Sequence, residues 1–190
     1  SSTGTRLETV SAGDDVSEQI PGGFDFNLYG TNHTNVYVCS NGFISLVSAS
    51  SAYDNIPLPA QSAPTAMIAP FWDDLNPAAS GDVYWQRETD KLIVQYQNVS
   101  RYGGGSSYTF QIVLFSSGAI EFRYHTITGH VNSCTIGIQD STGTLGRGFA
   151  VRPDMPASSS VPPSAPPEDF FIAPPLTATT PPLSPSLLRA

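Results

Sequence analysis

Charged residues are scarce in this sequence, and basic residues are the scarcest. Charged side chains make up 13% of the 190 residues, against about 25% in an average globular protein. The eight lysine and arginine residues are scattered singly and leave a formal net charge of −8. Because nucleic acids are bound through clusters of Lys and Arg, we expect no nucleic-acid partner. An acidic balance of this size is typical of a soluble secreted protein.

Long apolar runs are missing as well. No segment approaches the roughly 18 consecutive apolar residues of a membrane-spanning helix, so we expect no membrane insertion. The chain begins at Ser1 without a methionine. This is expected of a mature secreted chain after removal of a signal peptide, although a trimmed chain would begin in the same way.

Residues suited to catalysis are few and form no recognisable set. The three histidines, His33, His125 and His130, fall in predicted turns and at strand ends. No Gly-x-Ser-x-Gly segment is present to hold a serine nucleophile. The glycines at 103–105 lack the Lys-Ser/Thr that completes a phosphate-binding loop. We therefore expect that the protein is not an enzyme.

The sequence has only two cysteines, Cys39 and Cys134, and both lie in strand-like segments. In an oxidising compartment such a pair usually bridges neighbouring strands or loops, so we predict a disulfide between them. The alternative is two unrelated buried thiols. Their spacing does not match a zinc site, which needs closely paired Cys or His residues.

The sequence does contain many segments in which apolar and polar residues alternate with period two, the pattern of half-buried strands. Between two of them lies Asn41-Gly42, a strong hairpin signal because both residues tolerate positive φ. No segment sustains a helical period. Strands are predicted at 24–29, 36–39, 43–46, 67–72, 82–86, 91–96, 108–115, 119–125 and 134–139. These segments predict an all-β fold, an antiparallel β-sandwich.

The last predicted hairpin indicates which side chains reach the core. Side chains at every second position of a strand share one face, and here that face is apolar or aromatic on both strands. The residues expected to face the core are Phe110, Ile112, Leu114, Ile120, Phe122 and Tyr124.

Composition divides the chain into three parts. Residues 1–19 are expected to form a polar N-terminal arm, and residues 20–152 the β-sandwich domain. Residues 153–190 are a Pro-rich tail, since eleven of the seventeen prolines lie between Pro153 and Pro185. Proline lacks the N–H of a sheet ladder, so this tail is expected to be polyproline II or coil. Phe170, Phe171 and Ile172 are its apolar anchor.

Asp73 and Asp74 are the best candidates for a metal site. They follow the apolar segment 68–72, and adjacent carboxylates beside Asn76 could hold a hard cation such as Ca²⁺. They lack the Asp-x-Asp-x-Asp-Gly spacing of a calcium loop, and the pair Asp14-Asp15 is a weaker candidate. The alternatives are that they cap backbone amides in the turn before Pro77, or contact a partner directly. No other cofactor is expected.

Two sequons predict N-glycosylation. Asn32 is followed by His33-Thr34 and Asn98 by Val99-Ser100, each in or beside a predicted loop. The Ser-Pro and Pro-Pro composition of the tail also resembles that of hydroxyproline-rich extracellular glycoproteins.

Several aromatic residues could lie at the surface and stack on sugar rings. The alternative is that they pack within the core or across strands of a half-buried sheet. They are Tyr84, Trp85, Tyr96 and Tyr102.

Short motifs at residues 26–30, 36–43, 68–74, 94–99, 109–114 and 135–138 occur in an order that resembles the extracellular nidogen-like module. The resemblance covers about residues 24–143 and implies an extracellular β-domain of the kind found in matrix, adhesion and cell-surface proteins, without catalytic residues. Cys39 stands where this family commonly has Ser, which suggests a disulfide with Cys134 that this branch has gained.

These observations predict a secreted, non-enzymatic structural or adhesive module. It could be a repeating subunit of an extracellular filament or matrix, with the Pro-rich tail strapping neighbouring copies. The expected partners are other copies of the chain, or extracellular and cell-surface proteins. The alternative is a carbohydrate-binding module of a cell-surface protein, with glycans as partners and a site made by the surface aromatics and Asp73-Asp74.

Overall fold

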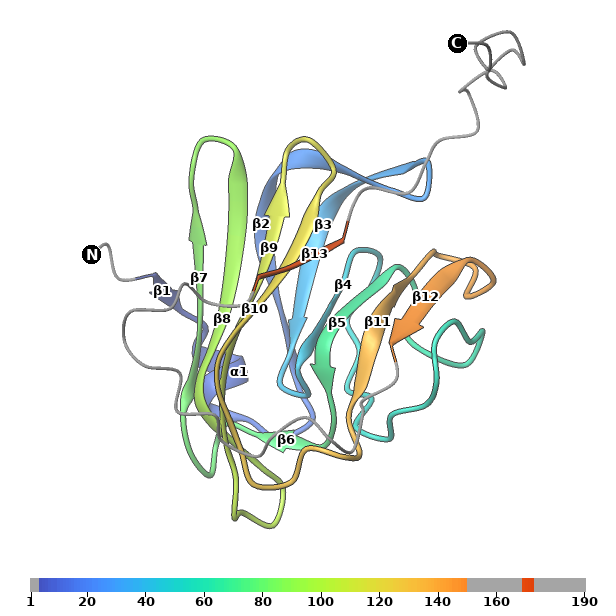
Figure 1. Cartoon of the computed structure of the whole chain (residues 1–190). Helices are drawn as coiled ribbons and strands as arrows, with labels where there is room; N and C mark the ends of the chain where they lie inside the picture. Colours follow the sequence, from blue (N-terminus) through green and yellow to red (C-terminus); the bar gives the residue numbers. More distant parts are fainter. Residues whose placement is uncertain (1–3, 150–168, 173–190) are drawn as a thin grey trace, which may run out of the picture.

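Two antiparallel sheets packed face to face make up the computed structural model, which describes residues 4–149 and 169–172 (Figure 1). The first sheet contains β1 (Thr5–Arg6), β6 (Leu75–Asn76), β7 (Asp82–Arg87), β8 (Lys91–Arg101), β9 (Ser107–Phe115), β10 (Ile120–Thr128) and β13 (Asp169–Ile172). The second contains β2 (Ser17–Leu28), β3 (Thr31–Cys39), β4 (Phe43–Ser45), β5 (Met67–Trp72), β11 (Thr135–Gln139) and β12 (Gly146–Phe149).

Strand order in each sheet follows a meander with few crossovers. The first sheet runs β1-β7-β8-β9-β10-β13, with β6 paired to β8, and the second runs β12-β11-β5-β4-β3-β2. All the described pairings are antiparallel, and the predicted all-β sandwich is confirmed.

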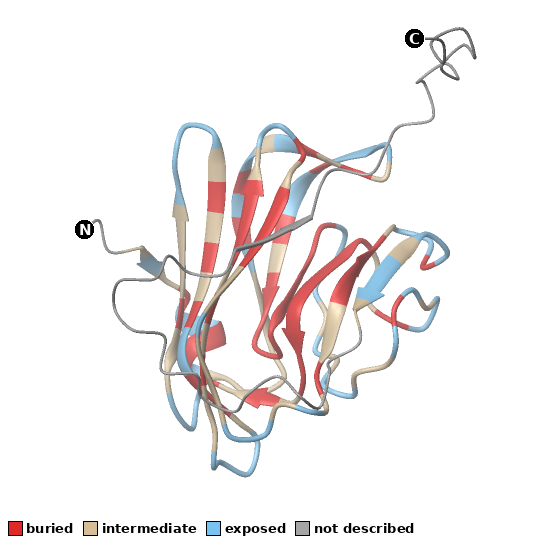
Figure 2. Ribbon diagram, in the orientation of Figure 1, coloured by how far each residue is buried: buried red, intermediate tan, exposed pale blue. Residues whose placement is uncertain are grey.

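Period-two alternation explains the inner face of the first sheet. Buried and partly exposed residues alternate along most of β8 and the first half of β9, which gives the striped ribbon of Figure 2, and Val83 is buried in β7. The predicted core face of the β9–β10 hairpin is confirmed. Its side chains are at most 2% exposed, except Tyr124, which is partly buried against the core: Phe110, Ile112, Leu114, Ile120, Phe122 and Tyr124.

The second sheet is covered on both faces at its centre. All residues of β4 and β5 are buried, because the loop at 46–66 packs over the face that points away from the main core. Trp72 donates its indole N–H to the carbonyl of Ala52 in that loop, 3.0 Å away. A strand that is buried on both faces has a continuous apolar sequence, and β5 has such a sequence. The smaller core cluster under the loop contains Cys39, Phe43, Leu58, Ala63, Met67, Ala69 and Trp72.

The N-terminal residues are part of the folded domain. Helix α1 (Glu8–Ala12) contacts β7 of the first sheet and β2 of the second, so it closes one open side of the sandwich. Leu7 and Val10 are 1% and 0% exposed in the main core. Five residues are too few for a helical period to show in the sequence. β2 starts at Ser17 and continues beyond residue 19, where the N-terminal arm was expected to end.

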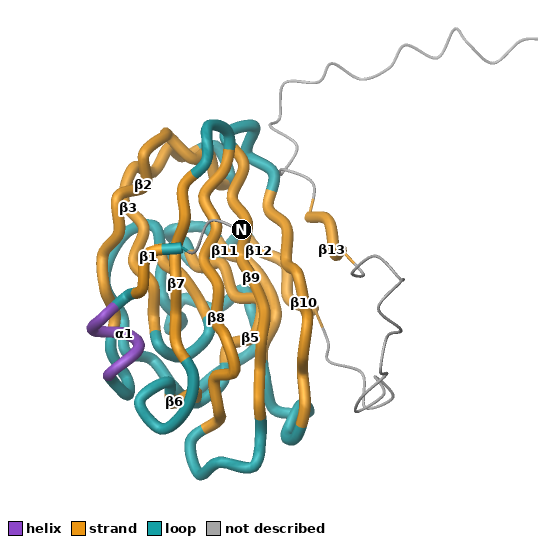
Figure 3. The backbone as a smooth tube through the Cα atoms, turned by 90° about the vertical axis from the view of Figure 1, so that its left-hand side faces the viewer, coloured by secondary structure: helices purple, strands orange, loops and turns teal. Residues whose placement is uncertain are grey.

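One segment of the Pro-rich region is described. β13 pairs with β10 as the outermost strand of the first sheet, and Figure 3 shows it beside β10. It contains the predicted apolar anchor Phe170, Phe171 and Ile172. The rest of the predicted tail, 153–168 and 173–190, lies outside the described residues.

Two tyrosine hydroxyls join the sheets across the core. Tyr96 of β8 lies within 2.5 Å of the carbonyl of Cys39 and 3.2 Å of that of Phe43. Tyr124 of β10 donates to the carbonyl of Pro70, 2.7 Å away. Tyr96 is fully buried, so of the two alternatives for the aromatic residues it follows packing in the core, and it is not available at the surface. Burial also raises the pKa of Tyr96 well above its usual value, and a buried phenol of this kind needs a hydrogen-bond partner.

The Tyr96 bridge leads to a stability prediction. Tyr96→Phe removes the donor and leaves a buried carbonyl without its partner, which costs about 1–3 kcal/mol of unfolding free energy. Urea unfolding followed by tryptophan fluorescence measures the loss. Tyr102→Phe is the matched control, because Tyr102 is 58% exposed and its change should stay within about 0.5 kcal/mol. Equal effects of the two substitutions would contradict the bridge.

Candidate functional site

The Asn41-Gly42 turn and the segment that ends in Asp73-Asp74, far apart in sequence, form one structural unit. The side-chain oxygen of Asn41 accepts the N–H of Leu75 at 2.9 Å, and its backbone carbonyl accepts that of Asp73 at 3.4 Å. Gly42 has φ +80°, and a Cβ there would lie 2.0 Å from the carbonyl oxygen of Phe71. No side chain fits at this position, so the turn requires glycine.

Asp73 is fully engaged by protein groups. One carboxylate oxygen accepts the backbone N–H of Asp74 at 2.9 Å and lies 3.4 Å from the guanidinium of Arg101. The other accepts the hydroxyl of Ser133 at 2.5 Å. Asp73 is 2% exposed, and these partners compensate its buried charge. Its geometry is that of the capping alternative, in which the carboxylate binds the turn itself.

Asp74 instead meets the pair Asp14-Asp15. One carboxylate oxygen from each of the three residues lies within 4.8 Å of the others, and we call these residues the acidic cluster. The segment after α1 brings Asp14 and Asp15 to the end of β5. In the sequence, Asp14 and Asp15 are about 60 positions before Asp74, so the two pairs were separate candidates and their contact was not predicted.

Two asparagine side chains orient the acidic cluster. Asn41 donates to Asp15 at 2.8 Å, and Asn76 donates to one oxygen of Asp14 at 2.8 Å. The other oxygen of Asp14 is buried without a hydrogen-bond partner. Asp15 has φ +51°, a conformation that Asp and Asn tolerate better than most residues.

Burial and mutual repulsion govern the charge of the acidic cluster. Burial raises the pKa of Asp14, and the neighbouring charge of Asp15 raises it further. Burial likewise raises the pKa of Asp74, followed by the charges of Asp15 and Asp14, while Arg101 acts in the opposite direction. Carboxylate oxygens gathered in this way are the ligands that Ca²⁺ prefers, and the unpartnered oxygen of Asp14 fits that role.

The predicted disulfide is absent, since Cys39 and Cys134 are both free and buried. β4 and β5 lie between their strands, and three strand spacings separate them by about 14 Å, beyond the roughly 7 Å that a disulfide spans. Cys39 belongs to the smaller core cluster and Cys134 to the main core. Burial raises the pKa of the two thiols to about 11 and about 12, which keeps them unreactive.

Both sequon asparagines lie at exposed positions of strands. Asn32 is near the start of β3 and accepts a hydrogen bond from the side chain of Asn27 at 2.7 Å. Asn98 lies at a register shift of β8 with φ +54°, and its side-chain oxygen accepts the hydroxyl of Thr109 at 3.2 Å.

The four predicted surface aromatics are not brought together. Tyr96 is buried, and Trp85 packs partly against the main core. Tyr102 is exposed in the turn after β8, while Tyr84 is half-buried on the first sheet. A carbohydrate site built from all four aromatics with Asp73-Asp74 does not match this arrangement.

The chain was also compared with known proteins. A NIDO-related family model matches residues 1–162, beyond the stretch that carries the motifs. The chain is 27% identical to alpha-tectorin from Mus musculus over 142 residues, and 25% identical to alpha-tectorin from Homo sapiens over 143 residues. Each alignment covers 60% of this chain but only 6% and 7% of these relatives. No solved structure matches the chain significantly.

These matches indicate an extracellular module. Within residues 4–149 and 169–172, no helix is long and apolar enough to cross a membrane.

The repulsion in the acidic cluster gives a pH prediction. Asp74→Asn should raise the unfolding free energy at pH 7 by up to about 1 kcal/mol, because it removes one of three crowded charges. Because the pKa values of Asp14 and Asp74 are raised, the folded protein binds protons more readily than the unfolded chain. The unfolding free energy of the wild type therefore rises as the pH falls through the folded pKa values toward 3.8, the ordinary pKa of Asp. The advantage of the variant should therefore shrink between pH 7 and pH 4. Urea unfolding in EDTA measures it.

Asp54→Asn is the control for this measurement, since Asp54 is exposed and outside the acidic cluster. An equal gain in both variants would show a general charge effect and contradict the local explanation.

The same variants test the expectation of Ca²⁺. If the acidic cluster holds the cation, about 1 mM CaCl₂, in the affinity range of extracellular calcium modules, should raise the melting temperature of the wild type and of Asp54→Asn. Asp74→Asn should lose this shift, and EDTA should reverse it. A melting temperature that CaCl₂ leaves unchanged in the wild type would contradict a calcium site.

Proposed function

The chain belongs to the NIDO-related family, and from this membership we propose that it is a secreted, non-enzymatic structural module whose copies are joined through β13. The family match and the extracellular nidogen-like motifs support the location and the structural role. The pairing of β13 with β10 supports the mode of joining.

The edge of β10 is the surface on which this proposal rests. Four residue pairs connect the strands, from Ile120 opposite Ile172 to Arg123 opposite Asp169. Without β13, one side of β10 would present unpaired N–H and C=O groups, which readily accept another strand. Strand addition at a sheet edge is a common mode of recognition, because the backbone ladder itself provides affinity.

The chain length between the domain and β13 allows two destinations for this strand. Residues 150–168 separate β12 from β13, and a connection of this length reaches at most about 60 Å. That reach includes both the same domain and a neighbouring copy. Exchange of an identical segment between copies adds no new type of contact, and a head-to-tail exchange that does not close produces a filament.

A pair of engineered cysteines distinguishes the two destinations. Arg123 and Asp169 are opposite each other in the register, at a distance that a disulfide can span. We expect the double variant Arg123→Cys/Asp169→Cys, oxidised at concentrations that favour assembly, to form covalent dimers and higher species on a non-reducing gel. The two native cysteines are buried and should not take part.

The two single-cysteine variants are the controls, because each can form at most a dimer through its own new thiol. A double variant that is oxidised completely within single chains, at every concentration, would contradict joining between copies.

A backbone substitution tests whether the ladder is needed. Phe171→Pro removes an N–H from β13 and disfavours the strand, so the average particle mass should fall several-fold in analytical ultracentrifugation while far-UV circular dichroism stays that of a β-protein. Ala178→Pro, outside β13, is the matched control and should assemble like the wild type. Unchanged assembly of Phe171→Pro would contradict the proposal.

The extracellular location predicts glycans at the two sequons. In protein secreted from eukaryotic cells, Asn32→Gln and Asn98→Asp should each lower the intact mass by one N-glycan, and peptide N-glycosidase should abolish the difference. Aspartate is chosen at position 98 because it tolerates the positive φ there. A wild-type mass equal to that of the bare polypeptide would contradict glycosylation.

A further inference from the structure

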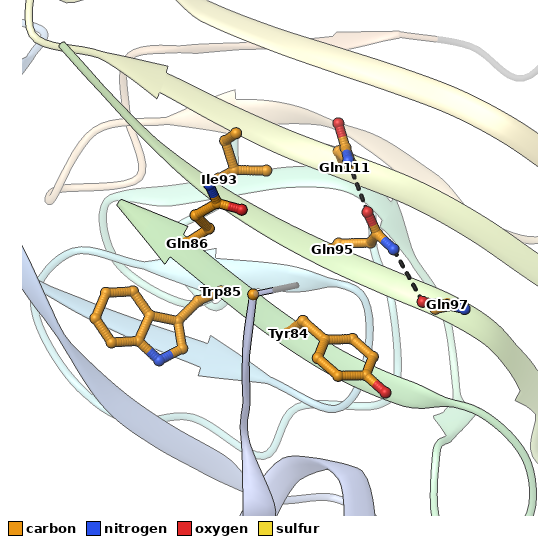
Figure 4. A pocket seen from close by; sticks show the side chains of 8 residues that line it. Tyr84, Trp85, Gln86, Ile93, Gln95, Gln97 and Gln111 are labelled. Carbon is orange, nitrogen blue, oxygen red and sulfur yellow. Dashed lines mark hydrogen bonds between the residues drawn. The ribbon is translucent and has the colours of Figure 1, made fainter. Parts of the chain in front are cut away.

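A hollow of about 440 Å³ lies on the outer face of the first sheet (Figure 4). It is open to solvent on one side and extends over β7, β8 and β9, with the chain before β1 at its rim. None of its lining residues carries a charge, in a chain whose net charge is −8. The lining residues are Gly4, Tyr84, Trp85, Gln86, Ile93, Gln95, Gln97 and Gln111.

Three glutamine side chains form a continuous row along this hollow. The amide of Gln111 donates to the side-chain oxygen of Gln95 at 2.7 Å, and the amide of Gln95 donates to that of Gln97 at 3.1 Å. Each amide group offers two donor hydrogens and two acceptor lone pairs, so two bonds leave most of this capacity unused. The row therefore presents free amide donors at Gln97 and a free carbonyl acceptor at Gln111.

Strand register places an aromatic ring beside the middle of this row. Tyr84 of β7 is opposite Gln95 of β8, which is opposite Gln111 of β9, so the three residues lie side by side across the sheet. Their side chains share the outer face, as Figure 4 shows. The hydroxyl of Tyr84 is 3.3 Å from the carboxylate of Asp82, which also pairs with Arg6 and helps to hold the ring.

This combination suits an uncharged ligand rich in hydroxyl groups. A tyrosine ring packs against the C–H face of a sugar, while amide groups donate to and accept from its hydroxyls. A phosphate or an acidic glycan would meet no cation in the lining, and a purely apolar ligand would leave the glutamines unsatisfied. Because the hollow is open and spreads over three strands, it fits a segment of an extended chain better than an enclosed small molecule.

We propose that this hollow binds an uncharged polysaccharide, with Tyr84 packed on a sugar ring and Gln95, Gln97 and Gln111 hydrogen-bonded to its hydroxyls. The site lies on the outer face of the sheet, whereas the proposed joining of copies uses the edge of β10. It corrects the composition of the carbohydrate site expected from sequence, since Asp73 and Tyr96 are buried and engaged elsewhere.

The test measures binding of the full chain to a glycan array and to soluble dextran, laminarin, mannan and xyloglucan, with heparin as the anionic comparison. Hits are quantified by isothermal titration calorimetry. We expect binding to at least one neutral polysaccharide and none to heparin. Tyr84→Ala and Gln111→Ala should each weaken that binding about tenfold.

Tyr102→Ala is the matched control, since it removes an exposed tyrosine away from the hollow and should bind like the wild type. Tyr84→Phe keeps the ring and should retain most of the affinity, which separates loss of stacking from loss of fold. The absence of binding to every neutral polysaccharide, binding to heparin alone, or neutral binding that Tyr84→Ala leaves unchanged would each overturn the proposal.

Discussion

The buried side chain of Asn41 is the interaction on which the arrangement of the candidate sites depends. It is fully buried, and its amide joins the β3–β4 turn to Leu75 after β5 and to Asp15 after α1. A buried amide is costly unless its donors and acceptors are paired, so it strongly favours the one arrangement that pairs them. This arrangement orients the N-terminal segment and brings the acidic cluster together.

The first sheet has two surfaces that are not used in the core of the sandwich and can bind other molecules. Its inner face is filled by alternate apolar side chains, which leaves its outer face and its edges, among them the β10 edge, for contact with other molecules. The outer face carries the glutamine row and Tyr84, and the edge accepts β13. The acidic cluster lies at the end of the sandwich, against the Asn41 turn. Because these surfaces share no residues, each can be altered without changing the others.

The period-two patterns of the sequence predicted most of the strands. They also indicate which aromatic residues face the core, which the list of possible surface aromatics did not take into account. Tyr96 occupies the same alternate positions as Leu92 and Val94, so the period of β8 already places it in the core, where it is found. Trp85 shares its face with Val83 in the same way and packs partly against the core. Helix α1 was missed because five residues do not complete a recognisable period. Gln95, Gln97 and Gln111 occupy alternate strand positions that face outward. Only the register between β8 and β9 shows that they form one row.

By itself, the sequence determined the all-β class, the positions of most strands, the inner faces and the hairpin at Asn41-Gly42, since each is a property of neighbouring residues. Only the tertiary structure decided that Asp74 meets Asp14 and Asp15, that Cys39 and Cys134 lie in different clusters, and that β13 pairs with β10. The reason is that strand order and register are set by the packing of two sheets over one core. Contacts between residues about 45 to 60 positions apart, such as these, leave no periodic trace in the chain.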